Sequence, residues 1–313
     1  MKILVSGGLG FIGHEVVRQL QGHDVLVIDN KTNYDFIPQK QIDKLVKLRD
    51  VECFVDYVDI RDQKAVTQIF YEFQPDVVIH LASFPRQKVV QQNPAVASEV
   101  MSTGLINLLQ SSVGIVNKFV YVSSSMVYGD FDDMVSEECE CNPRGQYAIM
   151  KYMGEKLVAD YKEYFDYVII RPSAVYGPKD VEDRVLSKFV LSALRNETLQ
   201  VKGPTEILDF TYVTDTACGI VLASTRDCKY DIYNITRCEP KPITLEKAAV
   251  TVISLGNSGS LELLDRDLNF PSRGRLDITR ARTDLGYNPT VNFEQGIKLY
   301  YQWMKEHDTI YKS

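Results

Sequence analysis

The chain lacks any apolar run long enough to cross a membrane, because charged or polar residues interrupt every hydrophobic stretch after a few positions. It also lacks the charged start, apolar core and small-residue cleavage site of a signal peptide, since Met1-Lys2 leads directly into a strand-like segment. These absences exclude an integral membrane protein. We therefore expect a cytoplasmic protein.

Metal-binding and disulfide patterns are missing as well. The six cysteines include no C-x-x-C pair, and the four histidines do not cluster near them. Cys139 and Cys141 are one residue apart, which suits a structural zinc site poorly. We expect reduced thiols and no metal. The cysteines are Cys53, Cys139, Cys141, Cys218, Cys228 and Cys238.

An excess of basic residues is also absent, because 35 Lys and Arg stand against 42 Asp and Glu, for a formal charge of −7. A nucleic-acid binder would need a basic face, so we expect no nucleic-acid partner. The composition of the 313 residues, 45% hydrophobic and 25% charged, is typical of a globular protein with one large α/β domain and a smaller lobe.

Glycines at the start of the chain carry the strongest functional signal. They follow the apolar run Ile3-Leu4-Val5 and precede Glu15–Leu20, which has helical periodicity. In a strand–turn–helix of this kind, the first glycine permits the tight turn and the second lets the backbone approach a pyrophosphate. The third lets the helix pack close to the strand. We expect this loop to bind a dinucleotide through Gly7, Gly10, Phe11, Ile12 and Gly13.

Asp29 follows the next strand-like segment, His23–Ile28, and lies about 20 residues past the glycines, where an acidic residue binds the adenosine ribose. Its charge would repel a 2′-phosphate, which favours NAD over NADP. We place Asn30 in the same site.

Strand-like and helical segments alternate along the first 170 residues, which predicts a parallel sheet covered by helices on both faces. We expect a Rossmann-type doubly wound α/β fold with a smaller mixed C-terminal substrate lobe. The NAD-binding domain would span residues 1–172 with a return segment at about 211–237, and the lobe 173–210 and 238–313. Further strands are expected at Val51–Val58, Val77–His80, Phe119–Val122, Tyr167–Ile170 and Asp231–Ile235, and helices at Gln63–Phe73, Pro94–Val113, Gln146–Tyr164, Arg184–Arg195, Thr214–Ser224, Thr244–Leu255 and Phe293–Glu306.

Polar or small residues follow several strands, where ligands bind in such sheets. Asp59 and Ile60 could bracket an adenine, although a simple strand-ending turn explains them about as well. We interpret His80 as a hydrogen-bonded part of the scaffold rather than as a catalytic base.

Tyr147 and Lys151 are one helical turn apart and share a face. A nearby ammonium lowers the pKa of a phenol, so we expect Tyr147 to act as a base. Ser124, at a strand tip, could bind the same substrate oxygen. A second pair, Tyr152 and Lys156, repeats the spacing but would be rotated away from the site.

Taken in order, these motifs resemble those of an extended short-chain dehydrogenase/reductase of the NAD-dependent epimerase/dehydratase family. The resemblance implies nucleotide-sugar substrates, tightly held NAD and a homodimer formed by the helices near Pro94–Val113 and Gln146–Tyr164. It implies cofactor contacts at Leu81, Ala82, Ser83, Ser123, Tyr147, Lys151 and Pro172, and substrate contacts at Ser83, Ser124, Ser125, Met126, Tyr147 and Ala174. The segments that carry it are Gly7–Gly13, Asp29, Asp59-Ile60, His80–Ala82, Ser123–Gly129, Tyr147 with Lys151, Arg171–Pro178, Asp209–Asp215 and Pro271–Gly274 with Asp277.

Two positions in the sequence limit which reaction of the family the chain could catalyse. Relatives that dehydrate or decarboxylate the sugar carry acids where this chain has Ser125 and Met126. A methionine cannot transfer a proton, so we favour 4-epimerisation of a UDP-sugar through a transient 4-keto intermediate. This reaction needs only Ser124, Tyr147, Lys151 and NAD.

Two departures from the family concern the substrate. Relatives often have Arg where Leu208 stands and Asn where Ala174 stands. Arg273 or Arg275 could bind the diphosphate instead, because a guanidinium suits that group. Arg184 and Lys188 lie in a segment that resembles the sugar-nucleotide segment of UDP-sugar members. Solvated surface charge explains these two residues almost equally well.

Three other functions stay open. A C4 dehydrogenase or 4-ketoreductase would use the same residues but would consume cofactor stoichiometrically. A dehydratase or decarboxylase would need acids placed elsewhere. A non-catalytic NAD-binding sensor is disfavoured, because such proteins usually lose the tyrosine and lysine that this chain keeps.

Overall fold

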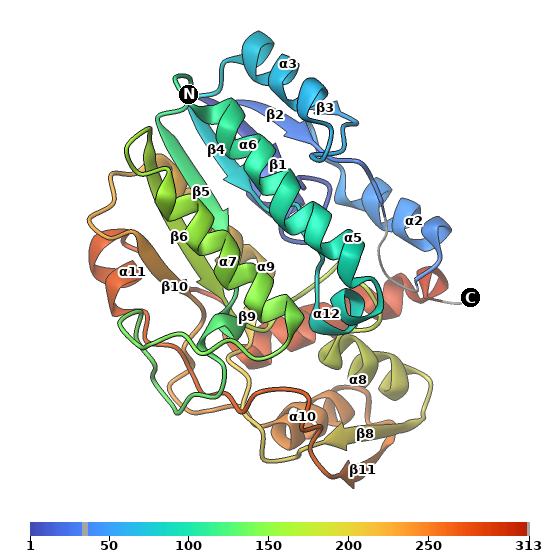
Figure 1. The fold of residues 1–313 in the computed structure, drawn as a ribbon. Coiled ribbons are helices and arrows are strands. Elements are labelled where there is room, and N and C mark those ends of the chain that lie inside the picture. The colour runs from blue at the N-terminus through green and yellow to red at the C-terminus, as the bar shows by residue number, and fades with distance from the viewer. Residues whose placement is uncertain (33–36, 312–313) are drawn as a thin grey trace.

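Seven parallel strands form the central sheet of the computed structural model, which describes residues 1–32 and 37–311, in the order β10-β6-β5-β4-β1-β2-β3 (Figure 1). Ser6 at the end of β1 pairs in register with Ile28 of β2 and His80 of β4. The carboxyl ends of these strands therefore share one edge. The strands are β1 (Lys2–Ser6), β2 (Asp24–Ile28), β3 (Phe54–Asp56), β4 (Val77–His80), β5 (Lys118–Val122), β6 (Asp166–Pro172) and β10 (Ile232–Ile235).

Helices cover both faces of this sheet, and a separate apolar core fills each side (Figure 1). One face packs against α1 (Gly13–Gln19), α9 (Val213–Thr225) and α11 (Thr279–Asp284). The other packs against α3 (Gln63–Phe73), α6 (Gly104–Ser112) and α7 (Gln146–Asp160). The expected doubly wound fold is confirmed.

A third core, formed largely by later segments, lies beyond the carboxyl edge of the sheet (Figure 1). It contains α8 (Val185–Leu194), α10 (Leu245–Gly256) and α12 (Phe293–Glu306), beside a two-stranded parallel sheet of β8 (Thr198–Lys202) and β11 (Ser260–Leu264). A second short sheet pairs β7 (Val175–Tyr176) with β9 (Thr211–Tyr212). These elements form a smaller mixed lobe, which includes β9 from the segment that was expected to return to the main sheet.

The expected helix at Pro94–Val113 is interrupted. It consists of α5 (Pro94–Ser98), a π-helical segment η1 (Glu99–Thr103) and α6. The helices α2 (Gln39–Arg49) and α4 (Gln87–Gln92) and the pairing of β8 with β11 have no clear pattern in the sequence and were not predicted. The remaining short helical turns are η2 (Ser125–Tyr128) and η3 (Asp308–Ile310).

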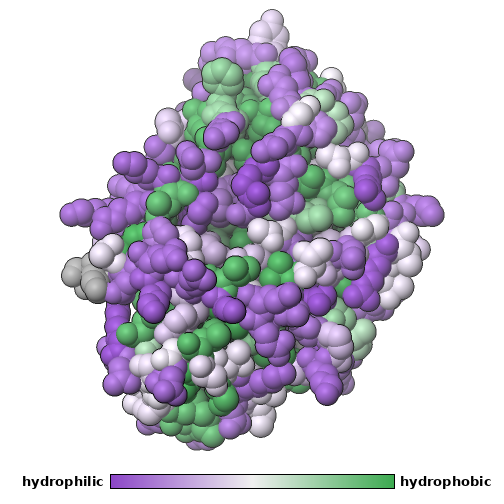
Figure 2. All heavy atoms as spheres, turned by 180° about the vertical axis from the view of Figure 1, so that it is seen from behind, coloured by the Kyte–Doolittle hydropathy of each residue, from purple (hydrophilic) through white to green (hydrophobic). Residues whose placement is uncertain are grey.

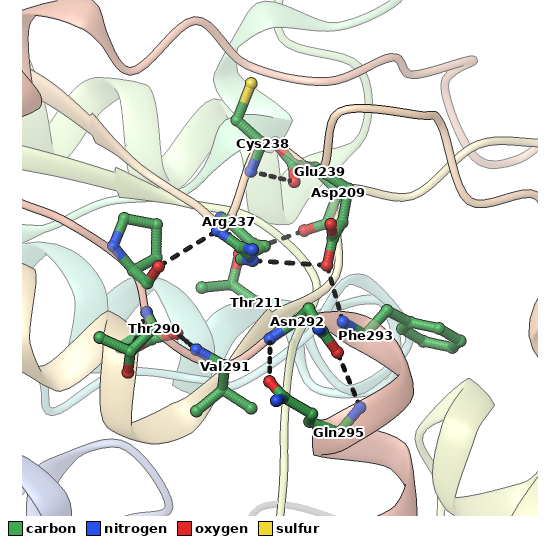
Figure 3. A network of polar contacts seen from close by, with 12 residues as sticks. Asp209, Thr211, Arg237, Cys238, Glu239, Thr290, Val291, Asn292, Phe293 and Gln295 are labelled. Carbon is green, nitrogen blue, oxygen red and sulfur yellow. Dashed lines mark hydrogen bonds and ion pairs between the residues drawn. The ribbon is translucent and has the colours of Figure 1, made fainter.

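A polar network ties the segment after β10 to the start of α12 (Figure 3). Arg237 donates from its backbone N–H to Thr211 Oγ1 at 2.9 Å and from Nη1 to the carbonyl of Pro289 at 3.1 Å. Glu239 forms a 3.4 Å ion pair with Arg237 and accepts a 2.6 Å hydrogen bond from the backbone N–H of Phe293. The last helix is thus anchored to the strand that returns to the main sheet.

A buried ion pair joins α7 to β6. Glu155 and Arg171 are each only 3% exposed at the side chain, and Arg171 Nη2 lies 2.6 Å from Glu155 Oε2. Ser123, directly after β5, donates a 2.6 Å hydrogen bond to Glu155 Oε1. Burial disfavours the charged form of Arg171, but Glu155 outweighs this effect and raises its pKa. One carboxylate therefore connects a helix to two strands.

The rear face of the molecule shows hydrophobic side chains in scattered groups among hydrophilic ones (Figure 2). Among the described residues, no helix is both long enough and apolar enough to span a membrane.

We predict that Arg171→Leu lowers the free energy of unfolding by about 3–5 kcal/mol, because it leaves the Glu155 carboxylate buried without its cation. The matched control is Arg144→Leu, which breaks an ion pair with Asp130 between side chains about half exposed, and should cost less than about 1 kcal/mol. Urea unfolding followed by circular dichroism measures both. Equal losses in the two variants would contradict the assignment.

Candidate active site

A cavity of about 1000 Å³ lies at the carboxyl edge of the main sheet, between this sheet and the smaller lobe. Its walls contain most of the residues that the sequence singles out for the cofactor and the substrate. These are Gly7, Gly10, Phe11, Ile12, Gly13, Leu81, Ser83, Ser123, Ser124, Ser125, Met126, Tyr147, Lys151, Pro172, Ala174, Arg184, Lys188 and Arg273.

The glycine loop forms one wall of this cavity and leaves no room for side chains. Gly7 has φ +77°, and a Cβ there would lie 2.6 Å from the backbone nitrogen of Ala82. A Cβ on Gly13 would collide with the carbonyl oxygen of Gly7. The loop therefore brings bare backbone to the cavity at the beginning of α1, as a pyrophosphate requires. These residues fit NAD.

Two side chains behind the loop fix the peptide groups of Leu9. Asp29 accepts a 3.1 Å hydrogen bond from the Leu9 N–H, and Arg49 donates a 2.7 Å bond to the Leu9 carbonyl. Arg49, the last residue of α2, also donates to the carbonyl of Lys179 at 2.9 Å. Burial raises the pKa of Asp29. Sequence reasoning missed Arg49, because no motif marks a side chain that binds distant backbone.

The proposed adenine contacts lie outside the cavity wall. Both oxygens of Asp59 are engaged, by Arg61 at 2.8 Å and 3.0 Å and by Asn30 at 3.0 Å. The hydrogen bond from Arg61 lowers the pKa of Asp59 to about 2. Ile60 is buried and packs where a Cβ on Gly104 would lie. In the structure Asp59 stabilises its own turn. Its contact with an adenine stays a prediction.

Ser124 and Tyr147 meet in the cavity. The Ser124 hydroxyl accepts from the backbone N–H of Met126 at 3.2 Å, and its hydrogen bond with Tyr147 only partly offsets the burial that raises the Tyr147 pKa. Gln87 accepts a 3.1 Å bond from the backbone N–H of Tyr147, which holds the first turn of α7. Sequence reasoning missed Gln87, which also lines the cavity.

Lys151 is 5% exposed, and its Nζ donates a 2.8 Å hydrogen bond to the carbonyl of Val122. Burial lowers the pKa of Lys151 to about 7, with Glu155 acting in the opposite direction. The expected lowering of the Tyr147 pKa by Lys151 is not seen in the structure. Burial raises the Tyr147 pKa, and the counteracting effects come from Ser124 and Arg184.

His80 belongs to the scaffold, as expected. Its Nδ1 lies 2.6 Å from Ser6 Oγ, and its ring stacks on that of Tyr121. Burial lowers the pKa of His80 to about 3. The second tyrosine–lysine pair also lies where expected, because Lys156 is exposed and its Nζ rests 4.8 Å above the ring of Tyr152.

Only one of the two arginines that were candidates for binding the diphosphate lies in the cavity wall. Arg273 lines the cavity, and its buried Nε has no hydrogen-bond partner among the described residues. Burial lowers the pKa of Arg273 to about 10, partly offset by Glu206. Arg275 is not part of the cavity wall, and its Nη1 and Nε bind the Glu239 carbonyl and Asp133. The structure therefore does not support Arg275 as a ligand of the diphosphate.

Leu208 and Ala174, the two departures from the family, both line the cavity. Ala174 adopts φ +38°, a region that asparagine tolerates better than alanine does. Arg184 and Lys188 line the same cavity, and Lys188 Nζ pairs with Asp183 at 2.6 Å. The Lys188 side chain is nonetheless 58% exposed to solvent, whereas that of Arg184 is 33% exposed.

Residues 3–236 match the model of the NAD dependent epimerase/dehydratase family. The chain belongs to this family. The family is the one that the glycine loop and the tyrosine–lysine pair predicted from the sequence. Its NAD dependence agrees with the expected cofactor.

Two relatives and one solved structure illustrate the similarity. The UDP-glucuronate 4-epimerase of Thermodesulfobacterium geofontis is 29% identical over 99% of this chain and 98% of its own length. A putative UDP-glucose 4-epimerase of Methanocaldococcus jannaschii is 30% identical over 98% and 99%. The UDP-glucuronic acid 4-epimerase of Bacillus cereus, solved with UDP-glucuronic acid and NAD, superimposes with a TM-score of 0.87 at 26% identity, covering 98% of this chain and all of that one.

We predict that Gly13→Ala abolishes NAD binding, because the new methyl group would collide with the Gly7 carbonyl in the phosphate cradle. Gly22→Ala is the control, since nothing lies within 4 Å of a Cβ there and only its positive φ adds strain. Isothermal titration with NAD measures both, and binding by Gly13→Ala with unchanged affinity would contradict the cradle.

We predict that Lys151→Met stabilises the cofactor-free protein, and more so at low pH. The folded-state pKa of Lys151 is lowered to about 7, so the folded wild type binds fewer protons than the unfolded chain above that pH. Its stability therefore falls as the pH decreases toward 7. Between about pH 9 and pH 6 the stability advantage of Lys151→Met should grow by about 3 kcal/mol. Urea unfolding at both pH values measures it, and a pH-independent difference would exclude a buried lysine with this pKa.

Proposed function

We propose that this protein is an NAD-dependent nucleotide-sugar 4-epimerase, acting on a UDP-sugar. The observation that carries the proposal is the meeting of Ser124, Tyr147 and Lys151 at one cavity wall beside the glycine loop, with no acid at Ser125 or Met126. Similarity to UDP-sugar 4-epimerases along nearly the whole chain supports it.

In the proposed reaction, Ser124 and Tyr147 bind the C4 oxygen of the sugar, and Tyr147 accepts its proton. When bound, NAD supplies reversible hydride transfer at C4 and a positive charge that favours the tyrosine phenolate. Once the 4-keto sugar has turned its other face toward the cofactor for the return of hydride to C4, Tyr147 gives the proton back to the C4 oxygen. Ser124 can hold the oxygen in both steps, because its hydroxyl both donates and accepts. The cofactor ends unchanged, so none is consumed.

Dehydration needs a general acid, and the acids on the cavity wall are already engaged. Asp183 is paired with Arg86 at 2.8 Å and with Lys188 at 2.6 Å. Burial raises the pKa of Asp183, but these cations outweigh burial and lower it. Glu206 is paired with Arg266 at 3.5 Å, and Asp267 accepts from the backbone of Asn269. An acid with a lowered pKa, such as Asp183, is a poor proton donor, and Glu206 and Asp267 are already engaged by other groups of the chain.

The remaining assignments complete the proposal. NAD would lie along the glycine loop, Asp29 and Asn30, with Leu81, Ala82, Ser83 and Ser123 beside it. The diphosphate would bind Arg273. A homodimer through the helices at Pro94–Val113 and Gln146–Tyr164, and a cytoplasmic location, are also proposed.

The test uses the purified protein without added cofactor, incubated with UDP-, GDP- and dTDP-sugars and followed by proton NMR. We expect a C4 epimer from a UDP-sugar. Conversion only when NADH or NAD⁺ is supplied stoichiometrically would favour the dehydrogenase or ketoreductase instead.

We predict that Tyr147→Phe lowers turnover by roughly 10²–10⁴-fold, the usual contribution of a positioned acid or base, while NAD stays bound. Tyr152→Phe is the matched control, because Tyr152 does not line the cavity and its ring lies beneath the ammonium of Lys156, and it should keep wild-type turnover. Substantial activity in Tyr147→Phe would overturn the assignment.

A further inference from the structure

We propose that Arg49 couples the binding of NAD to the binding of the nucleotide sugar, as a positioning residue that joins the glycine loop to the loop before α8. Arg49 itself lies outside the cavity wall. This inference rests on the proposed function, because it takes both ligands from it.

Helix α2, which ends at Arg49, follows Asp29 in the chain and so belongs to the part of the sequence that builds the cofactor site. Its apolar side nevertheless contributes to the core of the lobe. Leu45 is 0% exposed within that core, and Leu48 packs against it. Figure 1 shows α2 beside the end of the chain, whose Ile310 and Tyr311 belong to the same core. The helix is therefore fixed to the lobe.

Arg49 is 7% exposed and binds one backbone carbonyl on each side. Its Nη1 donates to the carbonyl of Leu9 at 2.7 Å, and its Nη2 donates to the carbonyl of Lys179 at 2.9 Å. Leu9 lies between Gly7 and Gly13 in the loop that fits a pyrophosphate. Both bonds come from one planar guanidinium, so neither carbonyl can shift far relative to the other without losing its bond.

Two carboxylates stabilise the charge of Arg49, one on each side. Asp29 accepts from the N–H of Leu9 at 3.1 Å, and Asp180 directly follows Lys179 and is 1% exposed. Burial lowers the pKa of Arg49 to about 10, and the charges of Asp180 and Asp29 oppose this effect. The side chain is therefore charged at neutral pH. A charged donor forms stronger hydrogen bonds than a neutral one.

The loop that Arg49 binds leads directly to the substrate side of the cavity. It runs from β7 to α8, and its residues Asp183 and Arg184 line the cavity. Gln41, in the first turn of α2, holds the same loop through a 3.1 Å hydrogen bond to Glu182. Because the two loops share α2 and its arginine, a ligand that orders one loop restrains the other. Each ligand should thus reduce the cost of binding the other.

The test titrates NAD into the full chain by calorimetry, with and without saturating UDP. The readout is the ratio of the two dissociation constants in one preparation, which does not depend on the fraction of folded protein. Arg49→Met removes both hydrogen bonds, and Arg49→Lys keeps the charge without the fork. Arg226→Met is the matched control, because Arg226 also donates to a distant carbonyl, that of Leu285 at 2.6 Å, which belongs to neither loop.

We expect UDP to lower the Kd for NAD by about tenfold in wild type and in Arg226→Met, a usual strength of coupling between two sites. The ratio should fall to about twofold or less in Arg49→Met, and Arg49→Lys should keep an intermediate ratio. Because such coupling is reciprocal, titration of UDP with and without NAD should give the same factors.

A wild-type ratio in Arg49→Met, even with weaker NAD binding, would show that Arg49 only supports the glycine loop and would overturn the coupling. Equal NAD affinity of the wild type with and without UDP would also overturn it, while leaving the proposed epimerase intact. Failure of UDP to bind the wild type, with or without NAD, would reject the UDP-sugar function and this coupling with it.

Discussion

The buried ion pair of Glu155 and Arg171 determines where α7 lies against the sheet. Glu155 is one helical turn after Lys151 and binds both Arg171 of β6 and the hydroxyl of Ser123 after β5. The face of α7 that carries Tyr147 and Lys151 is therefore held against the two strand ends that supply Ser124 and Pro172. A charge pair taken out of water contributes little net stability, but it tolerates few other arrangements. The ion pair therefore serves mainly to hold α7 in one position.

Burial also sets the chemistry of the site. The same low-dielectric surroundings lower the pKa of Lys151 and raise that of Tyr147, so burial disfavours the charged form of both residues. Positive charge that arrives with the cofactor can then shift the tyrosine toward its phenolate. Arg184 supplies a second positive potential from the lobe. Ser124 of the main sheet and Arg184 of the lobe thus both act on the pKa of the Tyr147 phenol.

Local patterns predicted the elements with strong periodicity. The helices Gln63–Phe73 and Phe293–Glu306 and the strand Val77–His80 were predicted with the bounds that the structure has. That these residues lie at one cavity was predictable as well, because a glycine turn, a serine strand tip and a tyrosine–lysine turn each have a local spacing that the fold brings together.

Other features depend on contacts between distant segments and leave no local signal. Arg49 binds the carbonyls of Leu9 and Lys179, which only the folded chain brings near it. Arg275 and Arg273 are two residues apart and were equally plausible ligands of the diphosphate from sequence, yet in the structure Arg275 binds Asp133. β8 and β11 are about sixty residues apart in sequence and pair only because α8 and α10 pack beside them.

The most direct test of the account is the fate of hydrogen at C4. A UDP-sugar carrying deuterium at C4 should give the inverted epimer with deuterium still at C4, in the presence of bound NAD alone and without free NADH. This result would mean that hydride leaves and returns within one closed site, where Tyr147 handles only the proton. Loss of the label to solvent, or one equivalent of free NADH per product, would contradict it.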